Sequence, residues 1–264
     1  MNRTSALLLA ILVGAPCVAR AGDESTTEEP TRSFDSAIKN AEAGTFNPFT
    51  FPARVEGRGS IAILSGYDSA YKSFELTGNA EVRVYGPLAV RVGVQWVPQK
   101  STIYPTAGLR LQVLKQGTHG IDLAVSAYYK AEGLTQGSTE GEIEANVAIG
   151  RSFGRLHLLG NLVGGSDFDG NDHDGEVRLS GVYSVRDTVL IGVDSRTRFD
   201  LGSNTANLVA NNKATFDVVA GPTLTVLVGP VALMATAGYS GAKLYNAASY
   251  ANGAIAMAGA GGAF

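Results

Sequence analysis

Polar and apolar side chains alternate one by one along most of this sequence, from about residue 54 to the end. The stretch EIEANVAI at 142–149 is typical, with carboxylate or amide side chains at every second position and aliphatic ones between them. A period of two indicates β-strands, whose successive side chains point to opposite faces. Roughly twelve such segments of about nine to eleven residues follow one another, the length of a tilted strand that crosses a bilayer.

The connections between these segments alternate between short and long. Short ones fall at Gly86-Pro87, Arg186-Asp187 and Gly229-Pro230, and long ones include 133–139 and 202–213. Short turns on one side and long loops on the other are typical of an up-and-down antiparallel barrel. The sequence therefore predicts an all-β transmembrane β-barrel of about 12 strands.

The polar faces of the predicted strands carry acids and bases together, and most of the bases are arginine. Only 17% of the chain is Asp, Glu, Lys or Arg. Opposite charges can pair in a narrow lumen, while the apolar face meets lipid. We expect the following residues to line the pore: Glu56, Arg58, Glu75, Glu81, Arg83, Arg91, Arg110, Asp122, Lys130, Glu142, Glu144, Arg155, His157, Glu176, Arg178, Asp194, Arg196, Arg198 and Asp217.

Aromatic residues on the apolar face collect near strand ends. Such residues form belts at the two membrane–water interfaces of a barrel. The predicted belt consists of Phe74, Trp96, Tyr129, Phe199, Phe216 and Tyr239 at the long-loop end, and of Tyr183 and Phe264 at the other end.

The N-terminal segment has a different composition. Residues 1–21 contain a basic residue, an apolar run and an Ala-Arg-Ala site, which together predict a secretory signal peptide. The only cysteine, Cys17, lies there, so no disulfide is expected in the exported chain. Residues 22–53 are expected to form a polar periplasmic extension, either a linker or a plug in the barrel mouth, and residues 54–264 the barrel.

One loop resembles a metal site in composition. Asp167, Asp169 and Asp174 offer oxygen ligands suited to Ca²⁺. The spacing departs from an EF-hand, because Asp172 stands at the sixth position and Arg178 at the twelfth. We interpret the loop as an acidic, solvated outer loop, with weak divalent binding as the alternative. No metal site or cofactor is predicted.

No catalytic site is predicted either. Of the three histidines only His157 falls on a predicted strand, where Ser180 and Asp194 are its conceivable partners for hydrolysis. The chain has no G-x-S-x-G or H-E-x-x-H motif. A net charge of −3 gives no electrostatic reason to expect nucleic acid as a partner.

An exported chain of alternating strands that ends in Phe264 resembles the porin-like outer-membrane β-barrels of Gram-negative bacteria. The resemblance implies export to the outer membrane, contact with its lipid, and recognition of the C-terminal strand by the barrel-assembly machinery. The longest loop, residues 202–213, has only about a dozen residues, so we expect a monomer. The leading functional expectation is a narrow channel for small hydrophilic solutes. The alternatives are a non-conducting structural or surface-interaction barrel with a salt-bridged lumen and, less favoured, a hydrolase.

Overall fold

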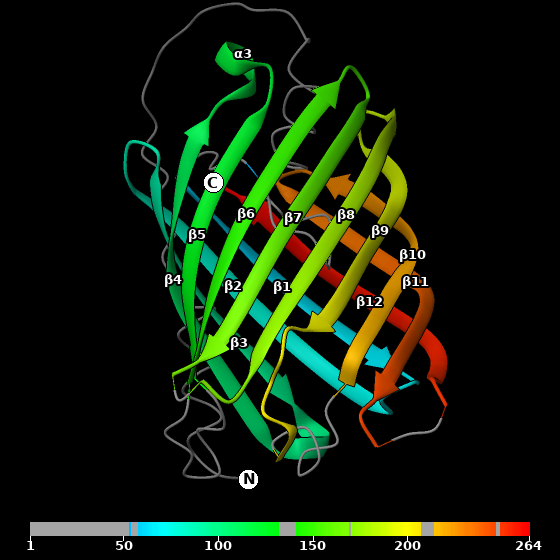
Figure 1. The fold of residues 1–264 in the computed structure, drawn as a ribbon. Coiled ribbons are helices and arrows are strands. Elements are labelled where there is room, and N and C mark those ends of the chain that lie inside the picture. The colour runs from blue at the N-terminus through cyan, green and yellow to red at the C-terminus, as the bar shows by residue number, and fades with distance from the viewer. Residues whose placement is uncertain (1–52, 54–57, 132–140, 169, 207–213, 247–248) are drawn as a thin grey trace, which may run out of the picture. The chain divides into compact units, whose positions relative to one another are not determined.

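The computed structural model describes residues 53, 58–131, 141–168, 170–206, 214–246 and 249–264. The chain divides into two compact units, 1–31 and 32–264, and every described residue belongs to the second. That unit contains twelve strands (Figure 1): β1 (Gly59–Asp68), β2 (Ser73–Tyr85), β3 (Leu88–Val97), β4 (Thr102–Leu114), β5 (Asp122–Ala131), β6 (Gly141–Phe153), β7 (Leu156–Asp167), β8 (His173–Arg186), β9 (Val189–Asp200), β10 (Ala214–Val228), β11 (Val231–Leu244) and β12 (Ala251–Ala263). The predicted start of the barrel at residue 54 lies outside the described residues.

The strands form one closed, antiparallel barrel. Each strand pairs with its neighbours in sequence, and β1 pairs with β12 from Ser60↔Ala263 to Asp68↔Ile255. The seam is completed by Phe264, whose backbone N–H donates to the carbonyl of Gly59 at 2.9 Å. Closure leaves no unpaired sheet edge, and the predicted twelve-stranded up-and-down barrel is confirmed.

The two ends of the barrel differ in their connections. At one end lie the short turns, several of which use a glycine with positive φ (Gly86, Gly154 and Gly229), together with the single-turn helix α3 (Gln116–His119). The longer loops are at the other end, where η1 (Pro98–Lys100) joins β3 to β4. Figure 1 shows the strands running obliquely between these ends, with α3 at the short-turn end. Among the described residues, no helix is long and apolar enough to cross a membrane.

Glycines on the inner wall allow the sheet to curve tightly. A side chain at Gly238 would overlap the carbonyl oxygen of Ala220 on the neighbouring strand, and one at Gly221 would overlap the carbonyl oxygen of Ala237. These close backbone approaches require residues without a Cβ, since real Cβ atoms do not approach so closely. The sequence thus supplies glycine where β10 and β11 bend together.

The inner and outer faces have opposite character. Outward residues of β6 such as Val147 and Ile149 are 44% and 47% exposed, whereas Glu142 and Asn146 on the other face are buried. Buried apolar side chains form two small clusters on the inner side, Val182, Leu190 and Ala232 in one, and Val219, Ile255 and Met257 in the other. The barrel therefore encloses a largely polar interior in place of one apolar core.

Candidate functional site

The inner wall of the barrel carries most of the side chains expected to line a pore. Those that are buried or half-buried on strands are Glu75, Glu81, Arg83, Arg91, Arg110, Asp122, Lys130, Glu142, Glu144, His157, Glu176, Arg178, Asp194, Arg196, Arg198 and Asp217. They occupy every strand from β2 to β10, so this part of the wall is lined by both signs of charge.

Two arginines are placed differently from the sequence-based expectation. Arg58 precedes β1 and is exposed. Arg155 is exposed in the short turn between β6 and β7, where it donates a hydrogen bond to the carbonyl of Val185. Both residues stand just beyond the regular strand, where alternation no longer fixes the direction of a side chain. Glu56 lies outside the described residues.

One charged cluster lies on β2, β3 and β4. The guanidinium of Arg110, which is 1% exposed, pairs with the carboxylate of Glu81. Arg91 stands opposite Glu81 in the β2–β3 register, and its guanidinium carbon lies 5.8 Å from the centroid of the Tyr128 ring. Arginine is suited to such sites because its planar group can pair and stack at once.

A second charged cluster surrounds the long-loop end of the lumen. Here Lys130 lies 3.2 Å from Glu142 and 3.6 Å from Glu144. The remaining pairs are Arg198–Asp174 at 2.8 Å, Arg196–Asp217 at 3.1 Å and Arg178–Glu176, with Nε of Arg178 at 2.7 Å. Together with the hydrogen bond of 2.7 Å from Gln95 on β3 to Glu75 on β2, these pairs place charges of both signs on strands β2, β5, β6, β8, β9 and β10.

A glycine makes room for two of these carboxylates. A side chain at Gly165 would overlap the carboxylates of both Glu142 and Asp174, which converge over it from the two neighbouring strands. Like charges so close repel each other unless cations lie beside them. Lys130 and Arg198 provide this compensation, since each is paired with one of the two acids.

The strand register places Glu142 away from the partners that alternation alone suggested. Alternation assigns Glu142, Glu144, Arg155 and His157 to the same face of two successive strands, and so suggests that they lie near one another. Glu142 instead stands opposite Asp167, and His157 stands opposite Ser152 at the other end of β6. The expectation was wrong because consecutive strands of a hairpin run in opposite directions, so that the first residue of one faces the last of the next.

The buried His157 lies in a small polar group at the short-turn end. Its Nδ1 is 2.8 Å from Oγ of Ser152. The side chain of Gln116 on α3 makes two hydrogen bonds with the backbone of Ser152. It accepts from the N–H at 2.7 Å and donates to the carbonyl at 2.9 Å. Ser180 and Asp194 do face each other across β8 and β9, but His157 is held by a different serine.

The acidic loop between β7 and β8 does not gather its carboxylates in the described part. Asp174 belongs to the inner wall and pairs with Arg198, and Asp167 ends β7 opposite Glu142. Asp169 lies outside the described residues. Within the described ranges, no three His, Cys, Asp or Glu side chains are arranged to hold a metal ion.

The expected aromatic belt lies on the outer face. Trp96, Tyr129, Tyr183, Phe216, Tyr239 and Phe264 are exposed there, and Phe74 and Phe199 are half-buried. Sequence reasoning missed further exposed aromatics near the strand ends: Tyr67, Tyr85, Phe153 and Phe168. Several rings cover glycines, as the Tyr129 ring covers Gly141 and the Phe264 ring covers Gly59. The aromatic ring shields the glycine backbone that lipid or water would otherwise reach.

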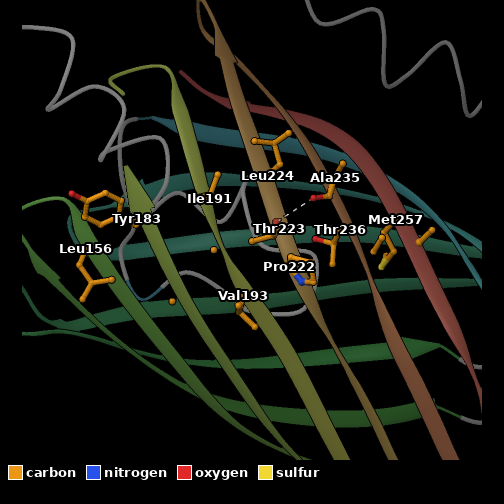
Figure 2. A pocket seen from close by; sticks show the side chains of 14 residues that line it. Leu156, Tyr183, Ile191, Val193, Pro222, Thr223, Leu224, Ala235, Thr236 and Met257 are labelled. Atoms are coloured by element: carbon orange, nitrogen blue, oxygen red, sulfur yellow. Dashed lines mark hydrogen bonds between the residues drawn. The ribbon is translucent and has the colours of Figure 1, made fainter. Parts of the chain in front are cut away.

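One groove of about 1090 Å³ spans β7 to β12, and its lining is apolar. Figure 2 shows exposed side chains such as Tyr183, Val193 and Leu224 around it, beside the small Ala235. A side-chain hydrogen bond between lining residues runs from Thr223 Oγ1 to the carbonyl of Ala235. An apolar groove with these outward residues suits contact with hydrocarbon and offers no donor set for a hydrophilic solute.

The described part of the chain before β1 includes one residue inside the barrel. Ala53 is 1% exposed, and its Cβ lies 3.1 Å from the position of a Cβ added at Gly150 on β6. Strands β6 and β1 are far apart in the strand order of the barrel. The remainder of the expected extension 22–53, and the expected signal peptide 1–21, lie outside the described residues.

No family model matches the chain, and no curated protein matches it in sequence. Among solved structures, the NanC porin is 9% identical over 77% of this chain and 100% of its own, with a TM-score of 0.55. The KdgM porin in complex with disordered oligogalacturonate is 8% identical over 78% and 99%, with a TM-score of 0.55. An outer-membrane channel from Pseudomonas putida F1 is 11% identical over 78% and 94%, with a TM-score of 0.52. The chain therefore has the fold of the porin-like outer-membrane β-barrels.

Proposed function

We propose that this protein is an outer-membrane channel for small hydrophilic solutes, which cross through the charge-lined interior of the barrel. The proposal rests on one observation: three of the four cations of the long-loop cluster keep contact with solvent inside the barrel. The Lys130, Arg196 and Arg198 side chains are 26%, 29% and 35% exposed, whereas the carboxylates of Glu142 and Asp217 paired with the first two are 10% and 4% exposed.

The exposure of these cations indicates water on the inner side of the wall. Outside the barrel, the same strands present Val147, Ile149, Val193 and other apolar side chains, which are suited to lipid. A wall that is apolar outside and solvated inside supports a path for polar molecules. The fold shared with NanC and KdgM, which are named as porins, supports the same class of function by analogy of fold alone.

A liposome-swelling assay tests this proposal. Proteoliposomes that contain the folded barrel are diluted into an isosmotic solution of a small neutral sugar, and the decrease in turbidity is followed. We expect faster swelling than in protein-free liposomes, and slower swelling as the sugar becomes larger. Swelling at the protein-free rate with every sugar would contradict the proposal.

A second candidate function, a sealed structural barrel, is favoured by a different observation. Arg110 and Asp194 are 1% and 0% exposed, so part of the inner wall is packed tightly. In a sealed barrel, removal of luminal charge would lower stability without changing permeability. In a channel, removal of solvent-exposed charge changes the ion selectivity.

A further inference from the structure

The connection between β1 and β2, residues 69–72, folds against the inside of the barrel. Oδ1 of Asp68 accepts hydrogen bonds from the N–H of Ala70 at 2.9 Å and of Tyr71 at 3.4 Å, which sets the turn. Lys72 completes it with a left-handed φ of 51°. The chain is thereby reversed in four residues, with Tyr71 at its tip.

The inner wall of β12 is shaped to receive this connection. A side chain at Gly253 would overlap the backbone nitrogen of Ala70 and Oγ of Ser69. Ser69 continues the seam, because its N–H donates to the carbonyl of Ala254 at 2.9 Å and its Oγ accepts from the N–H of Ala254 at 2.7 Å. The absence of a Cβ at Gly253 therefore lets the loop backbone lie directly on the wall.

Two hydrogen bonds join the connection to strands further around the barrel, β11 and β10. Oγ of Ser240 on β11, a residue that is fully buried, donates to Oδ2 of Asp68 at 2.7 Å. The hydroxyl of Tyr71 donates to Oδ2 of Asp217 on β10 at 3.2 Å. Because β12 and β11 separate β1 from β10, the loop backbone and the Tyr71 side chain together cross the inner faces of both strands.

Tyr71 joins the charged cluster at the long-loop end. The other oxygen of its partner Asp217 accepts from Arg196 at 3.1 Å. Tyr71 is 38% exposed, and the partial burial of its hydroxyl, followed by the neighbouring Asp217 carboxylate, raises the pKa of the Tyr71 hydroxyl above its ordinary value, so it stays protonated and can donate. The Tyr71 side chain is thus held at its backbone by the turn and at its hydroxyl by the Asp217 carboxylate.

We infer that Tyr71 narrows the lumen at the long-loop mouth and sets the largest solute that enters, an inference that rests on the proposed channel function. The wall it crosses is built of small inward residues, among them Ala242 and Gly253. Without the Tyr71 side chain these small groups would be uncovered, and that side of the mouth would be wider.

The test compares single-channel currents of the wild-type protein, Tyr71→Ala, Tyr71→Phe and a control, Tyr250→Ala, in planar bilayers. Tyr250 lies in another loop at the same end and is exposed, so its loss removes an aromatic ring without altering the turn. Heat-modifiable migration in gels establishes that each barrel is folded. Polyethylene glycols of increasing size, added to the bath, measure the exclusion limit.

We expect Tyr71→Ala to conduct more than the wild type and to admit larger polymers. Tyr71→Phe, which keeps the ring and loses the bond to Asp217, should show noisier current at a similar mean conductance, and Tyr250→Ala should match the wild type. A conducting wild type with an unchanged Tyr71→Ala would overturn the inference and leave the channel function intact. Silence of all four folded proteins would overturn the channel function, and the inference with it.

Discussion

The guanidinium of Arg110 on β4 reaches the carboxylate of Glu81 on β2 across the intervening strand, where the short side chain of Ala89 stands opposite Arg110. The pair is buried, with side-chain exposures of 1% and 10%. This ion pair joins β2 to β4, two strands that share no backbone hydrogen bonds because β3 lies between them. Its net worth depends on both charges being present.

Replacing Arg110 with Leu should destabilise the barrel, because the Glu81 carboxylate would remain buried without its cation. The expected loss in the free energy of unfolding is about 3–5 kcal/mol. Urea unfolding in lipid vesicles measures it. The double variant Arg110→Leu/Glu81→Leu should recover most of the loss, and the exposed Arg155→Ala should change stability by less than about 0.5 kcal/mol. Equal losses in Arg110→Leu and Arg155→Ala would contradict this view of the pair.

The outer face is tested by a charge placed in the middle of β6. Val147→Arg should cost roughly 2–4 kcal/mol of folding free energy if the outer face is in contact with the bilayer midplane. The matched control is Val84→Arg, since Val84 is also exposed but lies near the end of β2, where the expected cost falls to about 0–1 kcal/mol. Folding titrations in vesicles give both values, and two equal costs would argue against a membrane-embedded outer face.

Ion selectivity should follow the exposure of luminal charge. Because Lys130, Arg196 and Arg198 face the lumen water more than Asp174 and Asp217 do, we expect the channel to prefer anions. Arg198→Gln should shift the reversal potential in a KCl gradient towards cations. Arg155→Gln removes the same charge from an exposed turn and should leave the potential unchanged. A reversal potential that does not respond to Arg198→Gln would count against a conduction path past this residue.

The curvature between β10 and β11 should depend on the missing side chain at Gly238. Gly238→Ala would place a methyl group on the carbonyl oxygen of Ala220, and the expected cost is about 1–3 kcal/mol. Gly164→Ala is the control, because its nearest atom would be 3.9 Å away, an ordinary contact. Thermal unfolding in detergent compares the two variants, and a Gly238→Ala barrel as stable as Gly164→Ala would refute the argument from curvature.

Alternation was sufficient to predict the barrel, because a period of two divides each strand into two faces wherever one face is apolar. The stretch 142–149 illustrates this, with Val147 exposed and Asn146 buried. Alternation could not predict residues at strand ends. Arg155 was assigned to the lumen but lies in a turn. One residue beyond the end of a strand, alternation no longer determines which way a side chain points.

Contacts between strands distant in sequence were beyond the same reasoning. The partner of Glu142 is Lys130 and not Arg155, which depends on the register of a hairpin whose long loop gives no fixed offset. The Tyr71–Asp217 bond joins residues 146 positions apart, and a loop tyrosine has no periodicity that would reveal it. The local feature in this loop is Asp68, an acid whose side chain accepts a hydrogen bond from the backbone of its own turn.

The conductance of the purified wild-type barrel in planar bilayers tests the central claim most directly. A channel whose solvated charges line a continuous path should give discrete current steps that vary with salt concentration. Heat-modifiable migration in gels must first establish that the reconstituted protein is folded. Folded barrels that leave the bilayer current at its baseline would contradict the channel and favour the sealed, salt-bridged barrel.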